Sequence, residues 1–309
     1  MGQRTDVTFL SGQVNCAAWL YEPDTAPDTP PRATLVMAHG LGAVRDMGLD
    51  AFAQRFVAHG YRCLVFDYRY FGASDGRPRQ LLSVRRQRED WAAAVAFAHT
   101  LPGEAPVVAW GTSFSGGHAI HVGATAEPGS PGTVDAVIAQ CPFTDGVASV
   151  LRIPPVVSAK LTLRAVRDIA ASLLGRDPVT VATAGGAGDT ALMTADDVID
   201  GYLGLVPPDS TFRNEVAARI VPGILTSRPG GYARKLTVPA LFCLCRADSV
   251  APVAASRRHV ARAPQGVVKE YDAGHFDIYS GADFDAVVAD QLAFLGDVFG
   301  DVSGDVSGD

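Results

Sequence analysis

Short apolar runs recur along the chain, at residues 34–38, 63–66, 107–110, 134–139 and 239–245. Polar residues, glycine or proline bound each of them. Runs that are almost entirely apolar, rather than alternating, predict strands that are buried on both faces. The pattern therefore predicts the middle of a sheet with helices on each side.

Segments with helical spacing separate these runs. Residues 49–59 carry apolar side chains at helical intervals and end at Gly60, a common helix stop, and residues 83–101 show the same spacing. Strands that alternate with helices imply right-handed crossovers and a mostly parallel sheet, which defines the α/β class. The remaining predicted elements are two antiparallel strands at 7–10 and 16–21, a last strand at 267–271 and a closing helix at 284–299.

The alternation stops between residues 146 and 235. No strand is predicted there, and the pattern favours helices at 154–174, 195–205 and 211–225. Ligands of such sheets bind beyond the carboxyl ends of the strands, and this segment interrupts the sheet where that site should lie. We therefore expect a helical cap over this edge. A run of ordinary peripheral helices is the alternative.

The chain is thus expected to have four parts. Residues 1–145 and 236–299 form the two halves of the core, and residues 146–235 form the helical cap inserted between them. Residues 300–309 repeat Gly-Asp-Val-Ser. They are too poor in apolar residues to order themselves, which predicts a disordered acidic tail.

The chain of 309 residues is 48% hydrophobic and has a formal net charge of −7. This acidic balance disfavours nucleic acid and anionic membranes as partners. No apolar run approaches the roughly 20 residues of a membrane helix, and the N-terminal residues lack the apolar segment of a signal peptide. Five cysteines in apolar settings indicate reduced thiols. Together these features predict a cytoplasmic protein.

The most specific local pattern surrounds Ser113. The apolar run at 107–110 continues into Gly111, and Ser-Gly-Gly occupies residues 115–117. Small residues on both sides of a serine permit the strained turn that holds a hydroxyl between a strand and a helix N-terminus. Ser115 replaces the last glycine of the G-x-S-x-G pattern, so a strand-to-helix turn without chemistry is the alternative.

Two further residues complete a set for acyl transfer. A serine becomes a good nucleophile only when a histidine takes its proton and an acid orients that histidine. His275 follows the last predicted strand and Asp248 follows the strand at 239–245, so both reach the sheet edge where Ser113 lies. Asp145, which follows the strand at 134–139, is the competing candidate for the acid.

Together with the His39-Gly40 turn, these residues identify a resemblance. Over nearly its whole length the chain resembles the α/β-hydrolase superfamily, in which the order Ser, Asp, His is the usual one. Within it the chain is similar to capped bacterial esterases, and its core resembles the dienelactone hydrolase and X-Pro dipeptidyl-peptidase groups. The resemblance implies an α/β-hydrolase fold with Ser113 as nucleophile, His275 as general base and acid, and Asp248 as the orienting carboxylate.

The resemblance also implies an oxyanion hole formed by the backbone N–H groups of Leu41 and Phe114. We expect His39 to brace the turn that carries this site and Asp67 to hold its own loop through hydrogen bonds. Ser115 is expected either to substitute for a glycine or to donate a hydrogen bond near the acyl group. The two histidines behind Ser113 are expected to be packed or exposed, namely His118 and His121.

A serine nucleophile argues against the aspartyl-ester chemistry of haloalkane dehalogenases and epoxide hydrolases. The chain shows neither a nucleotide-binding glycine pattern nor metal-ligand spacing, so no cofactor and no metal are expected. The predicted function is hydrolysis of a carboxylic ester of a small to medium, hydrophobic molecule. Lactone or thioester hydrolysis, acyl transfer and non-catalytic ligand binding remain alternatives.

The expectation of a hydrophobic substrate depends on apolar residues in the predicted cap. These side chains could line a pocket, or they could simply pack the cap onto the core. The residues concerned are Leu151, Val156, Val157, Leu161, Leu163, Leu173 and Leu174.

Overall fold

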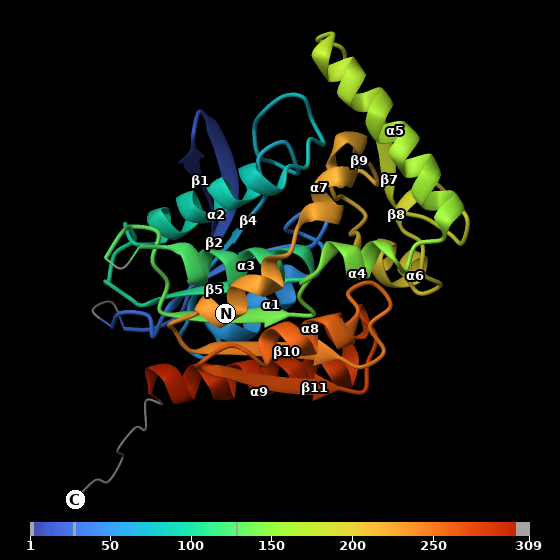
Figure 1. The fold of residues 1–309 in the computed structure, drawn as a ribbon. Helices are drawn as coiled ribbons and strands as arrows, with labels where there is room; N and C mark the ends of the chain where they lie inside the picture. The colour runs from blue at the N-terminus through green and yellow to red at the C-terminus, as the bar shows by residue number, and fades with distance from the viewer. Residues whose placement is uncertain (1–2, 27–28, 128, 301–309) are drawn as a thin grey trace, which may run out of the picture.

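The computed structural model describes residues 3–26, 29–127 and 129–300 (Figure 1). The main sheet consists of β1 (Gln3–Ser11), β2 (Val14–Glu22), β3 (Thr34–Ala38), β4 (Arg62–Phe66), β5 (Val107–Thr112), β6 (Ala136–Gln140), β10 (Ala240–Cys245) and β11 (Gly266–Tyr271). Its strand order is β1-β2-β4-β3-β5-β6-β10-β11. The strands from β4 to β11 are parallel to their neighbours, while β1 and β2 add an antiparallel edge. The predicted α/β class is confirmed.

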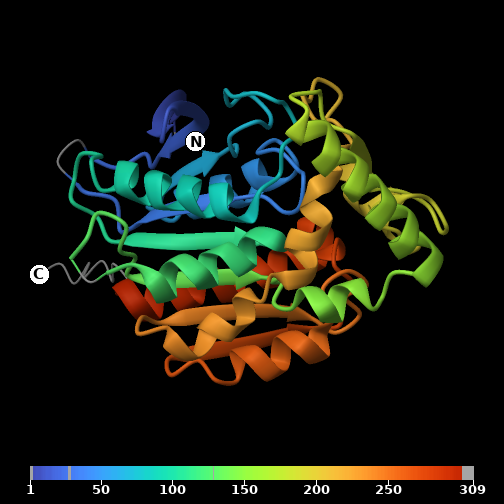
Figure 2. The same ribbon diagram turned by 45° about the horizontal axis from the view of Figure 1, so that its top comes forward.

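Helices cover both faces of this sheet (Figure 2). They are α1 (Leu49–Val57), α2 (Val84–Ala98), α3 (Phe114–Thr125), α8 (Val253–Val260) and α9 (Gly281–Phe299). Apolar residues of α1 and α9 belong to one buried cluster, and those of α2, α3 and α8 belong to the other.

Strand β10 shows why its sequence is apolar without interruption. Leu241, Cys243 and Cys245 point to the cluster under α1 and α9, whereas Phe242 and Leu244 point to the opposite cluster. Successive side chains of a strand face opposite sides, so a strand that is covered on both sides needs apolar residues at every position. The two layers hold the carboxyl ends of the strands in a fixed arrangement.

The chain between β6 and β10, called here the β6–β10 segment, contains both helices and strands. It comprises α4 (Gly146–Val150), α5 (Pro155–Leu173), β7 (Thr180–Ala184), β8 (Ala191–Met193), α6 (Val198–Tyr202), β9 (Val216–Ala217) and α7 (Val221–Thr226). Short 3₁₀ turns occur at Leu203–Leu205, Ala218–Ile220 and Pro229–Lys235 in this segment, and at Asp277–Tyr279 before α9. Figures 1 and 2 show α5 extending away from the main sheet, beyond the carboxyl ends of its strands.

The expectation that residues 146–235 contain no strand is wrong. Strand β7 lies between β8 and β9 in a small second sheet. These strands are short and rich in alanine and threonine, so they lack a clear alternating pattern. Their pairing joins distant residues, such as Thr180 and Ala217, which local periodicity does not reveal. Strand β9 and a 3₁₀ turn also replace the first part of the helix expected at 211–225.

Three other expectations concern the chain as a whole. All five cysteines are buried and free, as expected for reduced thiols. Within the described ranges, no helix has the length and apolar character needed to cross a membrane. Apart from Gly300, the predicted acidic tail at 300–309 lies outside the described residues.

Candidate active site

Strand β5 ends in the sharp turn that carries Ser113. Ser113 has φ 55° and ψ −118°, a conformation that is costly for a residue with a side chain. The backbone on either side is too close for larger residues: a Cβ on Gly111 would overlap the Ser115 carbonyl, and one on Gly117 would overlap the Phe143 carbonyl. The small residues around Ser113 therefore make this strained turn possible.

The side chains of Ser113, His275 and Asp248 meet above the sheet edge. The Nε2 atom of His275 lies 3.0 Å from the Ser113 hydroxyl oxygen, and its Nδ1 atom lies 2.7 Å from Oδ2 of Asp248. His275 and Asp248 are both buried. These distances are those of a nucleophile, a base and an orienting acid joined by hydrogen bonds.

The second oxygen of Asp248 is also fixed. Its Oδ1 accepts hydrogen bonds from the backbone N–H groups of Val250, at 2.9 Å, and Ala251, at 2.6 Å. Asp145, the competing candidate, instead caps α4 by accepting from the N–H groups of the second and third residues after it. Its other oxygen faces His259 at 3.7 Å. The geometry therefore pairs His275 with Asp248 and gives Asp145 a local role.

The turn after β3 brings Leu41 beside Ser113. A Cβ on Gly40 would lie only 3.0 Å from the Ser113 Cβ, so this approach depends on glycine. The backbone N–H of Phe114 is the first of α3, and the first N–H groups of a helix have no partner within it. Among the described contacts, the N–H groups of Leu41 and Phe114 have no protein acceptor. They are thus free to bind an oxyanion.

Ser115 is neither a simple glycine substitute nor a donor to the acyl group. Its buried hydroxyl donates to the backbone carbonyl of His39 and contacts the Tyr68 hydroxyl. The Tyr68 hydroxyl in turn accepts from Nε1 of Trp91 at 2.7 Å. His39 begins the turn that carries Leu41, called here the oxyanion turn. The hydrogen bond from Ser115 therefore connects the turn at Ser113 to the oxyanion turn. The sequence showed only that this position was small.

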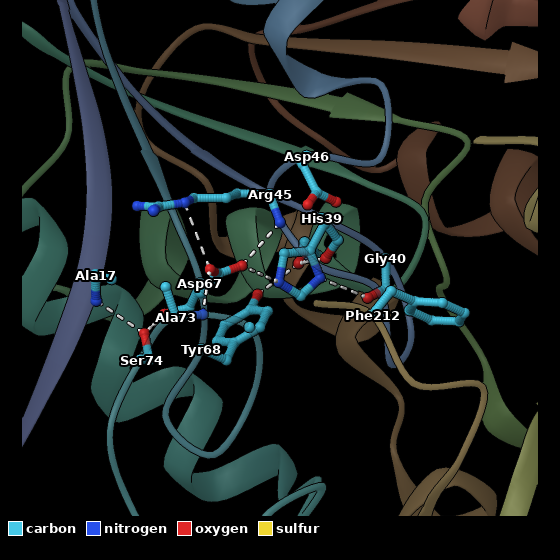
Figure 3. A network of polar contacts seen from close by, with 12 residues as sticks. Ala17, His39, Gly40, Arg45, Asp46, Asp67, Tyr68, Ala73, Ser74 and Phe212 are labelled. Atoms are coloured by element: carbon cyan, nitrogen blue, oxygen red, sulfur yellow. Dashed lines mark hydrogen bonds and ion pairs between the residues drawn. The ribbon is translucent and has the colours of Figure 1, made fainter. Parts of the chain in front are cut away.

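Figure 3 shows His39 and Asp67 close to each other, in a network that includes Gly40 and Arg45. Oxygens of Asp67 accept from the backbone N–H groups of Arg45 at 2.8 Å and Ala73 at 3.1 Å, so Asp67 holds its loop as expected. Nδ1 of His39 lies 3.1 Å from the Gly40 carbonyl, and its Nε2 lies 3.9 Å from Asp67. Burial lowers the pKa of His39 to about 4 and raises the pKa of Asp67. His39 is therefore a neutral brace at neutral pH.

This neutral histidine predicts a pH-dependent loss of stability. Between its folded pKa of about 4 and its usual value of 6.5, the unfolded chain binds a proton that the folded chain excludes, so the unfolding free energy falls as pH falls. From pH ~7.5 to pH ~5, His39 should contribute a loss of about 2 kcal/mol. Urea unfolding at both pH values should show this loss in wild type and in His59→Gln, an exposed control, and a smaller loss in His39→Gln. Equal losses in all three proteins would contradict the assignment.

Helix α6 contributes residues that the sequence pattern did not indicate. The Tyr202 hydroxyl donates to the Leu41 carbonyl at 2.8 Å, and its ring contacts Phe276, the neighbour of His275. Gly201 lies so close to Phe276 that a Cβ would overlap that ring. Helix α6 therefore contacts both the oxyanion turn, at Leu41, and the loop that carries His275, at Phe276. Short, weakly patterned helices such as α6 give no signal of such contacts.

A cavity of about 250 Å³ opens onto Ser113, Leu41 and Phe114. Its remaining walls come mainly from the β6–β10 segment and are largely apolar. The apolar lining residues are Phe143, Val150, Ile153, Pro154, Leu161, Leu192, Met193, Ala195, Val221, Ile224, Leu225, Val250 and Ala251. The Ser149 hydroxyl is buried and has no hydrogen-bond partner in the described chain. The polar lining residues besides Ser113 are Ser149, Arg152, Ser158, Thr162, Thr194 and Ser249. The cavity thus suits a mostly apolar molecule.

Most of the apolar residues that suggested a hydrophobic substrate do not line this cavity. Leu161 does, and Val157 is buried in the core. The other five are exposed to solvent, namely Leu151, Val156, Leu163, Leu173 and Leu174. Their helical spacing could not show which face of α5 is covered. The apolar character of the cavity depends on other residues of the segment.

Cys141, Asp248 and His275 present possible metal ligands within 4.8 Å of one another. Two of them already bond to each other. The Cys141 sulfur lies 3.2 Å from the sulfur of Cys245, and this contact, followed by burial, raises the pKa of the Cys141 thiol well above its ordinary value. Because a metal binds the thiolate, this set fits a catalytic histidine-carboxylate pair better than a metal centre.

The sheet order, the turn at Ser113 and the aligned Ser113, His275 and Asp248 side chains define an α/β-hydrolase of the serine hydrolase type. Residues 29–279 match the family described as serine aminopeptidase, S33, and the chain belongs to this family of hydrolases.

Known relatives extend this result. The chain is 49% identical to the quorum-quenching protein AidA of Acinetobacter baumannii over 292 residues, which is 94% of this chain and 93% of that protein. It is 25% identical to the polyketide transferase af380 of Aspergillus fumigatus, over 90% of this chain and 92% of that one. The crystal structure of the α/β-hydrolase GrgF from Penicillium has a TM-score of 0.79, with 24% identity over 96% of this chain and 99% of that chain. This last likeness concerns the fold.

Proposed function

We propose that the protein hydrolyses a carboxylic ester, linear or cyclic, that carries an apolar acyl chain. The observation that supports this most directly is the hydrogen-bonded row Ser113–His275–Asp248, of which Ser113 lines a mostly apolar cavity. The quorum-quenching relative supports the inclusion of small signalling molecules among the candidate substrates. We also propose that residues 146–235 act as the cap that closes this cavity.

The proposed reaction follows from the geometry. His275 takes the proton of Ser113 as its oxygen attacks the ester carbonyl, and Asp248 stabilises the resulting imidazolium. The N–H groups of Leu41 and Phe114 bind the negative oxygen of the tetrahedral intermediate. His275 then gives the proton to the departing alkoxide, which leaves an acyl-enzyme on Ser113. Water, activated by the same histidine, releases the acid and restores the serine.

The cavity limits the size of the substrate. A volume of about 250 Å³ lies just below the usual range for drug-sized ligands, about 300–1,000 Å³. It suits a medium-length acyl chain or a small lactone better than a polymer. The mostly apolar wall offers no charge partner beside Ser113 other than Arg152, which also lines the cavity.

Transfer of the acyl group to an acceptor other than water is the second candidate function. Relatives described as polyketide transferases favour it, whereas a relative described as a thiohydrolase favours hydrolysis. Both reactions begin with the same acyl-enzyme. They differ in whether water or a second substrate reaches it, so product analysis with and without added alcohol or thiol separates them.

A labelling and turnover experiment tests the proposal. A fluorophosphonate should add once to the wild-type protein and not to Ser113→Ala, as seen by intact mass. The same variant should lose at least about a thousandfold in kcat on p-nitrophenyl octanoate. A panel of esters, an N-acyl lactone and thioesters with matched acyl chains then ranks the substrates. Full turnover by Ser113→Ala would reject the assigned nucleophile, and labelling without ester or lactone turnover would reject the proposed substrate class.

A further inference from the structure

A second cavity, of about 1050 Å³, lies between α2, α3 and α7, away from Ser113. Helix α7 separates it from the cavity that opens onto Ser113, called here the catalytic cavity. Ile224 of this helix lines the catalytic cavity, whereas Gly223 and Thr226 line the second one. The proposed ester hydrolysis makes no use of this space.

The walls of the second cavity carry positive charge that is not neutralised. Three arginines and one glutamate line it, Arg85, Arg88, Arg228 and Glu89, although the whole chain has a net charge of −7. Glu89 is already paired with Arg85 and with Arg69. Arg88 has no ion pair within the described part of the chain, and its buried Nε has no hydrogen-bond partner. Burial lowers its pKa, but a guanidinium stays charged in proteins.

A buried histidine beside Arg88 is also incompletely bonded. His118 is 3% exposed and lines the cavity, its Nε2 contacts Oε1 of Gln87 at 3.0 Å, and its Nδ1 has no partner in the described chain. Burial, followed by the charge of Arg88, lowers the pKa of His118 well below its ordinary value. Because Oε1 of Gln87 accepts from Nε2, the neutral ring leaves Nδ1 as an acceptor, which a carboxylate cannot satisfy. The unpaired donor of Arg88 is the group whose cost a bound anion can remove.

The rest of the wall combines apolar and aromatic side chains with four hydroxyl side chains, those of Thr125, Ser130, Thr226 and Ser227. The rings of His121 and Tyr232 are in contact, with centroids 4.6 Å apart, and Val84, Ala92 and Val122 complete this side. The apolar and aromatic part of this wall can cover a hydrocarbon or aromatic body.

We propose that this cavity is a second binding site, for an organic monocarboxylate with an apolar body. The carboxylate pairs with the Arg88 guanidinium, whose planar fork matches two carboxylate oxygens. The body packs against Tyr232 and the valines. The apolar and aromatic side chains beside Arg88 favour an organic carboxylate over phosphate, which has no apolar body to place against them. The site does not depend on the chemistry at Ser113.

Calorimetric titration of the full-length Ser113→Ala variant with octanoate tests this site without turnover. Octanoate should bind, and Arg88→Gln in the same background should weaken binding by at least about tenfold. Arg152→Gln is the comparison variant, because it should weaken binding only if octanoate, the acid product of the proposed reaction, occupies the cavity at Ser113 that Arg152 lines. Octanamide, which lacks the charge, and inorganic phosphate, which lacks the apolar body, should both bind more weakly than octanoate.

Several results would overturn the proposal. They are no octanoate binding, binding that Arg88→Gln leaves unchanged, or binding that only Arg152→Gln weakens. Octanamide or phosphate binding as tightly as octanoate would reject the ligand class. None of these results measures turnover, so ester hydrolysis by the wild-type protein can succeed or fail independently of this site.

A second measurement uses the wild-type chain, so it tests the site even if the Arg88→Gln variant does not fold. His121 lines the cavity and is partly exposed, and burial lowers its pKa to about 4, so its neutral ring can react with diethylpyrocarbonate. Octanoate should reduce the modification of His121, read by peptide mass spectrometry on the wild-type chain, and should leave the exposed His59 unchanged. Unchanged reactivity of His121 at saturating octanoate would contradict the site.

Discussion

Replacement of Asp248 by asparagine is expected to lower kcat by about four orders of magnitude, the loss typical when a triad histidine is left in the wrong tautomer. Asp248 has one oxygen 2.7 Å from Nδ1 of His275 and the other on two backbone N–H groups. An amide of the same shape can keep those backbone contacts, but it cannot stabilise an imidazolium. The loss should therefore appear in kcat on p-nitrophenyl octanoate, with unfolding by urea little changed.

Asp145→Asn provides the matched control. Asp145 also ends a strand and also accepts two backbone N–H groups, but its partner is His259 and not His275. Its replacement should leave kcat within a few-fold of wild type. A large loss in Asp145→Asn together with normal turnover in Asp248→Asn would reverse the assignment of the acid.

Replacement of Gly111 by alanine should have the largest effect on stability. The added Cβ would overlap the Ser115 carbonyl, which belongs to the backbone and cannot move without opening the turn at Ser113. Overpacking costs about 1–3 kcal/mol where side chains can adjust, so a loss of at least about 3 kcal/mol is expected here. Urea unfolding measures it, and fluorophosphonate labelling of any folded fraction should also fall.

The control for this substitution is Gly204→Ala. A Cβ at Gly204 meets no atom within 4 Å, so the unfolding free energy should change by no more than about 0.5 kcal/mol. If both alanine variants unfold at the same urea concentration as wild type, the turn at Ser113 tolerates a side chain and its proposed steric origin is wrong.

The middle of the main sheet could be predicted from the sequence because its strands carry mostly apolar residues, as β10 illustrates, and because helices of clear periodicity separate them. The grouping of Ser113, Asp248 and His275 followed from the same pattern, since each of them follows a strand of one parallel sheet. The rule that parallel strands end at a common edge was sufficient to group these residues, but it also placed Asp145 there, and the choice of Asp248 as the acid depended on the resemblance to α/β-hydrolases.

The remaining features depend on contacts between distant residues. Strands β7, β8 and β9 are stabilised by mutual pairing and have little periodicity of their own. The hydroxyl of Ser115 could be assigned only after Tyr68 and the His39 carbonyl were located. The exposed leucines of α5 show the same limit, because spacing identifies a stripe but does not show whether anything covers it.

The hydrogen bond from Tyr202 to the Leu41 carbonyl has a consequence for how such proteins diversify. If residues 146–235 only covered the cavity, relatives could exchange this segment and change their substrate range without any effect on catalysis by the core. Here the exchanged piece would also have to supply the hydroxyl on the oxyanion turn and the glycine against Phe276. Chimeras that transplant residues 146–235 should therefore keep activity only when both features come with the new segment, so substrate range and catalytic competence are inherited together.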